Sequence, residues 1–233
     1  MALPPNTNEA FLREVDEELR RDQLATFWER WGRWVIVAIV VGLAAFGAFL
    51  YAQHRAEQAA GVEGEKLQAA FAKLGANNPT AAAAPLAEIA ASKRDGYRTL
   101  AKFTQADIAL QKNDLKAAAA KFGEVAADMS VAQPFRDLAL VRQTSAEYDT
   151  LKPQVVIERL RPLAVPGNAW FGSAGEMVAM AHLRMNRRDL AGALFGQIAR
   201  NDDVPDSIRQ RAVQMAGVLG VDAIAPNEES KAQ

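Results

Sequence analysis

Nineteen consecutive apolar residues, from Trp34 to Ala52, constrain the fold of this chain more than any other feature of its sequence. No charge and no proline interrupts them, and at the rise of an α-helix they extend roughly 28 Å, close to the thickness of the hydrocarbon core of a bilayer. A core helix of a water-soluble protein would need a polar face, which none of these positions supplies. The stretch therefore predicts a transmembrane helix.

The residues on either side of this stretch distinguish a membrane anchor from a cleaved signal peptide. The 33-residue leader is rich in acids, and the exit sequence YAQHRAEQ lacks a small-residue cleavage site. Residues 14–33 carry four Arg and Lys, whereas residues 53–72 carry two. Because Arg and Lys beside a span are held preferentially on the cytoplasmic side, we expect an uncleaved anchor with its N-terminus in the cytoplasm.

The sequence FWERWGRW, which we call the tryptophan collar, leads directly into the apolar stretch. Trp28, Trp31 and Trp34 recur every third residue, and Arg30 and Arg33 lie between them. Indole rings favour the headgroup zone of a membrane, where an apolar body and a polar edge are both accommodated. The collar is interpreted as a membrane-interface anchor, with a specific binding site for the three rings as the alternative.

Residues 1–33 are expected to form a cytosolic amphipathic segment, since Leu12, Val15 and Leu19 fall on one helical face. A solvated, frayed helix and a helix that docks on a partner are both compatible with this pattern. The segment holds seven acids and five bases. This balance argues against a polybasic arm that binds lipid headgroups.

The charge balance and the scarcity of reactive side chains exclude several function classes. Residues 53–233 carry 22 Lys and Arg against 21 Asp and Glu, which leaves no basic footprint for nucleic acid. The absence of cysteine removes disulfides, thiolate catalysis and Cys-ligated metals. His54 and His182 are the only histidines, and neither a glycine-rich phosphate loop nor HExxH occurs. We therefore expect no enzyme, no cofactor and no metal.

After the span, the apolar pattern predicts a helical connector over residues 53–80 and then a series of helical hairpins over residues 81–222. The helix is expected to continue past Gly61 and Gly64 until the sequence GANNPT stops it. Beyond it, apolar residues recur at helical spacing and no alternating strand pattern appears. Three hairpins are predicted, followed by a capping helix from about Pro205 and a polar tail over residues 223–233. The apolar stripes of the two helices in each hairpin cover residues 97–110 with 115–125, 138–148 with 156–163, and 174–185 with 190–199.

Two of these hairpins share a sequence repeat. KFGEVA at residues 121–126 and LFGQIA at residues 194–199 match as F-G-[E/Q]-[V/I]-A, with an offset of 73 residues. We expect Phe122 and Phe195 to fill the seams between neighbouring hairpins. Asp114 before Leu115, and Asp189 in the corresponding place, are the expected N-caps of the second helices.

Internal repetition of this length is typical of a solenoid of stacked helix pairs. The offset of 73 residues is about two tetratricopeptide units, and ALQKNDLKAAAAKF resembles the central turn of that repeat, although its W-x2-L-G-x2-Y part is absent. The predicted fold is all-α: a single transmembrane helix followed by a degenerate tetratricopeptide-like solenoid.

The whole chain resembles the YfgM-like family, ancillary subunits of the SecYEG translocon. The most specific part of the likeness is FLREVDEELRRDQLATFWERWGRW leading into the span. The resemblance implies a bacterial inner-membrane protein with a periplasmic domain that associates with the translocon, with a PpiD-like chaperone and with translocating chains. A tethered scaffold for another envelope assembly, such as cell-wall synthesis or cytochrome maturation, is the alternative.

The expected mechanism is binding of protein partners on the surface lined by the first helix of each hairpin. Trp170 and Phe171 open the third hairpin and are expected to lie in the core or to anchor a partner. The candidate polar contact residues on the first helices are Arg98, Lys102, Gln105, Asp107, Arg136, Arg142, Glu147, Glu176 and Arg184.

Overall fold

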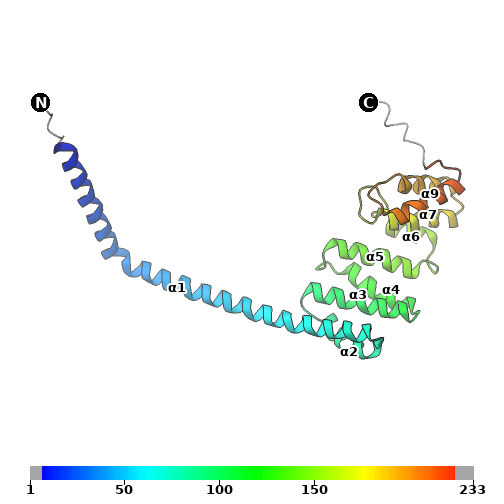
Figure 1. The fold of residues 1–233 in the computed structure, drawn as a ribbon, viewed down its shortest axis with the longest axis horizontal. Coiled ribbons are helices and arrows are strands. Elements are labelled where there is room, and N and C mark those ends of the chain that lie inside the picture. Colours follow the sequence, from blue (N-terminus) through cyan, green and yellow to red (C-terminus); the bar gives the residue numbers. More distant parts are fainter. Residues whose placement is uncertain (1–6, 224–233) are drawn as a thin grey trace. The chain divides into compact units, whose positions relative to one another are not determined.

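The computed structural model describes the backbone of residues 7–223 and the side chains of residues 28–223. Within that range the chain is helical and contains no strand (Figure 1). The side chains of the amphipathic segment before the collar, and residues 224–233 of the predicted polar tail, lie outside the described residues. The helices are α1 (Thr7–Gly75), α2 (Pro79–Ala90), α3 (Asp95–Gln111), α4 (Leu115–Ala127), α5 (Gln133–Glu147), α6 (Pro153–Leu160), α7 (Phe171–Arg184), α8 (Arg188–Ala199) and α9 (Asp206–Val218).

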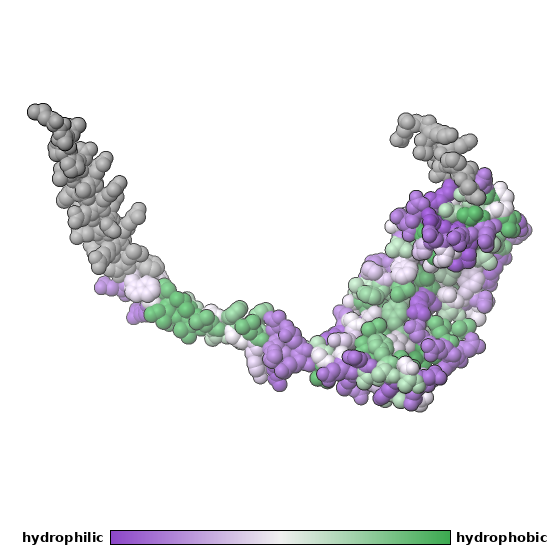
Figure 2. Space-filling view, viewed as in Figure 1, coloured by the Kyte–Doolittle hydropathy of each residue, from purple (hydrophilic) through white to green (hydrophobic). Residues whose placement is uncertain are grey.

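In the first unit of the chain, the described residues from Thr7 to Val62 form a single stretch of helix α1. Its apolar part is long enough to cross a membrane, and none of its most apolar window is buried. Figure 2 shows this part as a continuous hydrophobic band. A helix that is apolar on every side and covered by nothing requires an apolar surrounding, which a bilayer supplies.

The tryptophan collar lies at the start of this band, with all three indoles exposed. Arg30 and Arg33 are exposed as well. Gly32 is buried because the indole of Trp28 covers it, and a Cβ placed there would lie 3.4 Å from that ring.

The second unit begins at Glu63, inside α1, and consists of stacked helix pairs. The first pair is the end of α1 with α2, joined by a core of Leu67, Ala70, Leu86 and Ile89. Lys66 of α1 also pairs with Glu88 of α2 at 2.7 Å. The end of α1 lies in the predicted connector over residues 53–80, and its pairing with α2 was not predicted.

Three further pairs follow, α3 with α4, α5 with α6 and α7 with α8, and α9 covers the last of them. Each core cluster includes residues from a pair and from the next helix along the chain. This nearest-neighbour packing is what defines a solenoid. The predicted hairpins and capping helix are confirmed.

Three of the turns between paired helices share one backbone geometry. Asn77, Asn113 and Asn186 have φ values of 56°, 59° and 59°. At each one the asparagine N–H bonds three residues back, and the following N–H bonds five residues back, which is the Schellman motif. Asparagine tolerates this left-handed conformation better than other residues with a side chain. The same turn therefore closes three of the four pairs.

The F-G repeat marks the seams of the array, as predicted. Phe122 and Phe195 are fully buried, each in a cluster that joins its own pair to the next helix. The glycine beside each phenylalanine leaves room for a side chain of the next segment. A Cβ at Gly123 would lie 3.1 Å from Nε2 of Gln143, and one at Gly196 would lie 3.1 Å from Cγ1 of Val221.

The two predicted N-caps have different outcomes. Asp114 caps α4, with its carboxylate accepting the Ala117 N–H at 3.0 Å. The prediction for Asp189 is wrong, because the cap residue of α8 is Arg187 and Asp189 lies within the first turn. The 73-residue offset aligns Arg187, not Asp189, with Asp114. Asp189 still places a negative charge near the positive end of the helix dipole.

Candidate functional site

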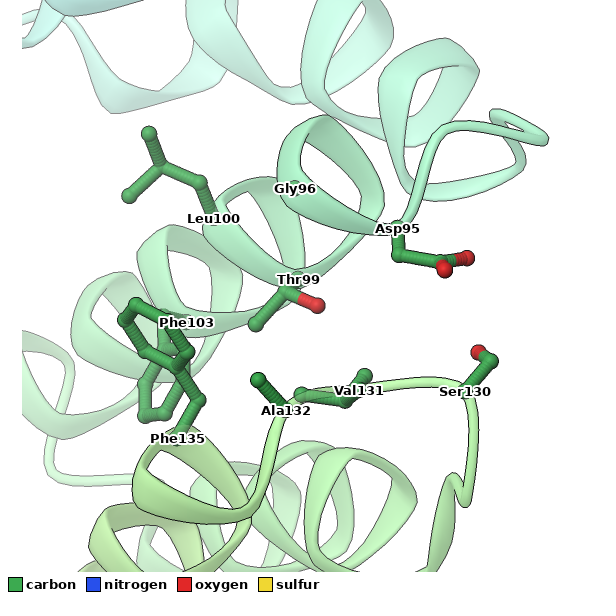
Figure 3. A pocket seen from close by; sticks show the side chains of 9 residues that line it. All are labelled: Asp95, Gly96, Thr99, Leu100, Phe103, Ser130, Val131, Ala132 and Phe135. Atoms are coloured by element: carbon green, nitrogen blue, oxygen red, sulfur yellow. The ribbon is translucent and has the colours of Figure 1, made fainter.

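Two hollows lie between the first helices of neighbouring pairs. The first, which we call the aromatic hollow, has a volume of about 410 Å³ and lies between the start of α3 and the start of α5 (Figure 3). Phe103 and Phe135 lie together at one end, whereas Asp95 and Ser130 face each other at the other end. The remaining lining residues are Gly96, Thr99, Leu100, Val131 and Ala132.

Leu100 falls within the apolar stripe predicted over residues 97–110, but it does not lie in the core. Its side chain is 44% exposed, and it lines the aromatic hollow together with Phe135, which is 54% exposed. Helix α3 packs against α2 on one side and against α4 on the other, so its buried positions do not form one stripe. Leu100 lies between the two contact surfaces and remains accessible.

A network around Arg98 fixes the polar end of the aromatic hollow. Its guanidinium donates to Asp95 at 2.7 Å, to Asp128 at 3.2 Å and to Oγ of Ser130 at 2.5 Å. A fourth bond reaches the carbonyl oxygen of Ser92 at 3.0 Å. The hydrogen bond from Ser130 and the pairing with Arg98 lower the pKa of Asp128. Arg98 therefore holds the loop before α5 against α3 and preforms this end of the hollow.

The second hollow, which we call the methionine hollow, has a volume of about 540 Å³ and lies between α5, α7 and α9. Three of the six methionines of the chain, Met177, Met180 and Met215, line it. Methionine side chains are flexible and polarisable, so such a surface adapts to ligands of different shape. The other lining residues are Ser145, Tyr148, Asp149, Glu176, Phe195, Arg211 and Gln214.

Polar contacts hold the walls of the methionine hollow in place. Arg211 of α9 binds both carboxylate oxygens of Glu176 of α7, at 2.8 and 2.7 Å, and this raises the pKa of Arg211. The Tyr148 hydroxyl donates to the carbonyl oxygen of Met177 at 3.4 Å. Burial raises the pKa of Tyr148, and a hydrogen bond from Arg184 opposes that rise. These contacts hold the polar walls of the hollow in place around the flexible side chains of the three methionines.

The repeat register relates the two hollows to each other. With the offset of 73 residues, Phe103 of α3 is equivalent to Glu176 of α7, and Asp107 is equivalent to Met180. Phe103 lines the aromatic hollow, while Glu176 and Met180 line the methionine hollow. The same position of a first helix thus faces a hollow in two different repeats.

Most of the charged residues that were predicted to contact partners form ion pairs or hydrogen bonds within the array. Lys102 pairs with Glu124 at 3.1 Å. Arg142 pairs with Asp107 at 2.7 Å and lies 4.8 Å above the ring of Phe122. Charges engaged in this way join neighbouring helices, and a partner would have to compete for them.

The other nominated residues near the end of α5 also make intramolecular contacts. Glu147 pairs with Arg159 of α6. Arg184 donates to the carbonyl oxygens of Tyr148 and Leu151, at 3.0 and 3.1 Å, which satisfies groups that the end of a helix leaves unpaired. Of these five residues, only Tyr148 lines the methionine hollow.

The remaining nominated residues divide between surface and core. Arg136 donates to Oε1 of Gln133 at 3.1 Å at the start of α5. Gln105 is half-buried, and its Oε1 has no hydrogen-bond partner among the described residues. Trp170 is half-buried against the core cluster of α5, α6 and α7, and Phe171 is fully buried.

Sequence reasoning missed the apolar lining of both hollows. Phe135 directly follows Pro134 at the start of a helix, ahead of the apolar stripe of α5. Met177 and Met180 lie three residues apart on α7, beside the predicted stripe that runs through Val178. Apolar residues that fall outside the core stripe of a first helix were the signal that could have found these positions.

In the part of the chain that the structure describes, no group of three or more His, Cys, Asp or Glu is arranged to hold a metal. His182 is half-buried near the end of α7. Burial lowers its pKa, Arg187 lowers it further and Asp189 opposes the change. A neutral histidine at this position is compatible with a structural role.

The sequence model of the tetratricopeptide repeat-like domain family matches residues 25–161. The chain belongs to this family. The match begins two residues before the tryptophan collar and includes the aromatic hollow, whereas α7, α8 and α9 follow it and continue the tetratricopeptide-like packing. Searches of the curated proteins and of the solved structures found no match.

Tetratricopeptide-like repeats are modules for binding other proteins. The geometry agrees with that role, since the described surface offers two hollows with apolar linings and charged rims. A mostly apolar lining with a few polar groups is the usual composition of a binding site.

Proposed function

We propose that the chain is a membrane-anchored protein-binding module in which residues 34–52 cross the membrane and the tetratricopeptide-like array binds protein partners without catalysis. The observation that carries the proposal is the continuity of α1, which includes both an unburied apolar stretch and the first helix of the array. One helix thus joins the anchor to the binding surface.

We further propose that the N-terminus lies in the cytoplasm and the array in the periplasm of a bacterial inner membrane. The excess of Arg and Lys before the span supports this orientation. A reporter that is active only outside the cytoplasm, fused after Gln233, is expected to be active. An inactive reporter, or a mature chain that begins near Gln53, would contradict the proposed topology.

The partners we propose are the SecYEG translocon, a PpiD-like chaperone and chains in translocation, as the resemblance to YfgM-like proteins implies. Two features of the array support such partners. The methionine hollow is suited to segments of varied shape. The anchor keeps the array beside membrane partners, which raises their effective concentration, so the affinity of each hollow can be weak.

Photocrosslinking in intact cells tests the choice of partner. A photoreactive residue is introduced at Phe135 or at Met180, which line the two hollows, and at Leu190 on α8 as an exposed control. Translocon subunits and the chaperone are expected at the first two positions and not at Leu190. Capture of proteins of cell-wall synthesis or of cytochrome maturation instead would replace the translocon with a scaffold function.

A further inference from the structure

The offset of 73 residues relates α3, α4 and α5 to α7, α8 and α9, helix by helix. Added to the first residue of α5, it gives Asp206, where α9 begins, and added to the last residue of α3 it gives Arg184, where α7 ends. Helix α4 begins at Leu115, and the offset gives Arg188, where α8 begins. Contacts between α3 and α5 therefore have counterparts between α7 and α9.

One contact between α3 and α5 locates two methionines in the later helices. Asp107 of α3 pairs with Arg142 of α5 at 2.7 Å. With the offset, Asp107 corresponds to Met180 of α7, and Arg142 corresponds to Met215 of α9. Both methionines line the methionine hollow. Two thioether side chains thus lie where the earlier helices have an ion pair.

A polar contact between α7 and α9 sets the same register. Arg211 of α9 binds both carboxylate oxygens of Glu176 of α7, at 2.8 and 2.7 Å. Met180 and Met215 each follow their member of that ion pair by four residues. Residues four apart share a helical face and lie about one turn apart along the axis. The two thioethers are therefore on facing sides of α7 and α9, one turn beyond the ion pair.

Met177 adds a third thioether to this set. It precedes Met180 by three residues on α7, so the two side chains share one face, with Cβ atoms about 5–6 Å apart. Met177 also lines the methionine hollow, and its carbonyl oxygen accepts the Tyr148 hydroxyl at 3.4 Å. Met180 is 39% exposed, which leaves the set open to a small ion from solvent.

Three thioethers in one hollow form a soft and uncharged set of ligands. Thioether sulfur is a ligand for Cu(I), whereas carboxylate, carbonyl and water oxygens suit Mg²⁺ and Ca²⁺. The residues with described side chains offer no group of three or more His, Cys, Asp or Glu to a harder cation. The whole chain lacks cysteine, so no thiolate competes for a soft cation. The lining therefore favours a soft monovalent ion.

We propose that Met177, Met180 and Met215 bind one Cu(I) ion in the methionine hollow. The ion links α7 to α9 and thereby holds the last helix on the array. Glu176 and Arg211 are positioning residues, because their ion pair sets how α9 lies against α7. This metal site goes beyond the proposed protein-binding function and does not depend on it.

Competition with the chromogenic Cu(I) chelator bicinchoninate tests the site, with the full chain in detergent micelles under anaerobic conditions. We expect one Cu(I) ion per chain to pass from the chelator to the protein. X-ray absorption at the copper K-edge should then show sulfur neighbours, because no nitrogen or carboxylate ligand belongs to the proposed set. Ag(I), which is also soft and monovalent, should displace the copper.

Leucine variants assign the ion to these methionines. Met180→Leu and Met215→Leu each remove a sulfur but keep a similar side-chain volume, so the fold is retained. Each is expected to lower the Cu(I) affinity by at least about tenfold, since even changes beside a metal ligand cost about 10–100-fold. The matched controls Met129→Leu and Met185→Leu remove a sulfur outside the hollow and should bind like the unmodified chain.

Two further measurements test positioning and linkage. Arg211→Gln removes the ion pair with Glu176 and is expected to lower the Cu(I) affinity about tenfold, with the sulfur neighbours unchanged in the absorption spectrum. Cu(I) should raise the thermal midpoint of the full chain, because an ion that binds only the folded state stabilises it. The variant with leucine at all three methionines should show no such increase.

Two outcomes would overturn the proposal. If the chain took no Cu(I) from the chelator, or if the triple leucine variant took as much, the methionines would only fill the space between α7 and α9. Nitrogen or oxygen neighbours without sulfur would place the copper at another site. Neither outcome bears on protein binding, which the crosslinks at Phe135 and Met180 test separately.

Discussion

Truncation of Phe122 is the most informative perturbation of the array. Its ring is fully buried, its centroid lies 5.8 Å from that of Phe103, and the guanidinium of Arg142 lies 4.8 Å above it. Phe122→Ala therefore removes a ring that contacts both α3 and α5. Loss of a buried phenylalanine costs about 3–5 kcal/mol, because neighbouring side chains only partly fill the cavity.

The position of Phe122 in a solenoid also predicts how unfolding changes. The stability of a repeat array is approximately a sum of repeat terms and interface terms between neighbours. The lost contacts join the pair of α3 and α4 to α5, so this interface is expected to weaken more than the rest. We expect urea unfolding to become broader or to separate into two steps, with hydrogen exchange accelerated first in α3 and α4.

Two variants calibrate the result. Asp114→Ala removes the cap bond to the Ala117 N–H and should cost about 1 kcal/mol. Phe135→Ala makes the same truncation at an exposed ring and should cost no more than about 0.5 kcal/mol. Unfolding is followed by circular dichroism of the full chain in detergent. If either control destabilised the chain as much as Phe122→Ala, the assignment of Phe122 to a seam would be refuted.

Further predictions concern glycine, asparagine and histidine. A Cβ at Gly172 would lie 2.7 Å from Cγ1 of Val204, whereas one at Gly217 meets nothing within 4 Å. In urea unfolding, Gly172→Ala should therefore lower the free energy of unfolding by about 1–3 kcal/mol. Gly217→Ala should leave it unchanged or raise it by up to about 1 kcal/mol. At Asn113, with φ of 59°, Ala should cost about 1 kcal/mol and Gly almost nothing; equal effects would contradict the left-handed turn. Burial lowers the pKa of His182 below 6.5, so the unfolded chain takes up a proton first and stability falls as the pH drops from 6.5 through the folded-state value. Thermal melts between pH 7.5 and 5 should depend less on pH in His182→Asn, and an unchanged dependence would exclude His182 as the source.

The sequence was sufficient to predict an apolar helix long enough to cross a membrane, the three later helix pairs and the capping helix. The apolar helix follows from an uninterrupted run of apolar residues, and the helix pairs follow from local spacing, because residues three and four apart share a helical face whatever surrounds them. Phe122 and Phe195 were identified as seam residues for the same reason, since a repeated motif places equivalent side chains at equivalent interfaces. Asp114 was identified as a cap because its bond reaches only three residues along the chain.

The first helix pair could not be predicted in the same way. Helix α2 is rich in alanine, and Leu86 and Ile89 are its only large buried side chains. Its partner is the end of the same helix that contains the apolar stretch. A short alanine-rich helix is stabilised mainly by packing against its neighbours, and its own sequence pattern is too weak to predict which helix it packs against.

The candidate binding surface depended on contacts between residues far apart in the sequence. The sequence nominated Arg98 and Glu176 for partner contact, but the structure pairs Arg98 with Asp128 and Glu176 with Arg211. These partners are 30 and 35 residues apart, a separation at which helical period carries no information about contact. Leu100 falls within a predicted apolar stripe but lies outside the core for the same reason. The sequence by itself determined which residues form helices and which faces of them are apolar; only the tertiary structure decided which apolar and charged side chains remain available, because that depends on which two helices flank each one.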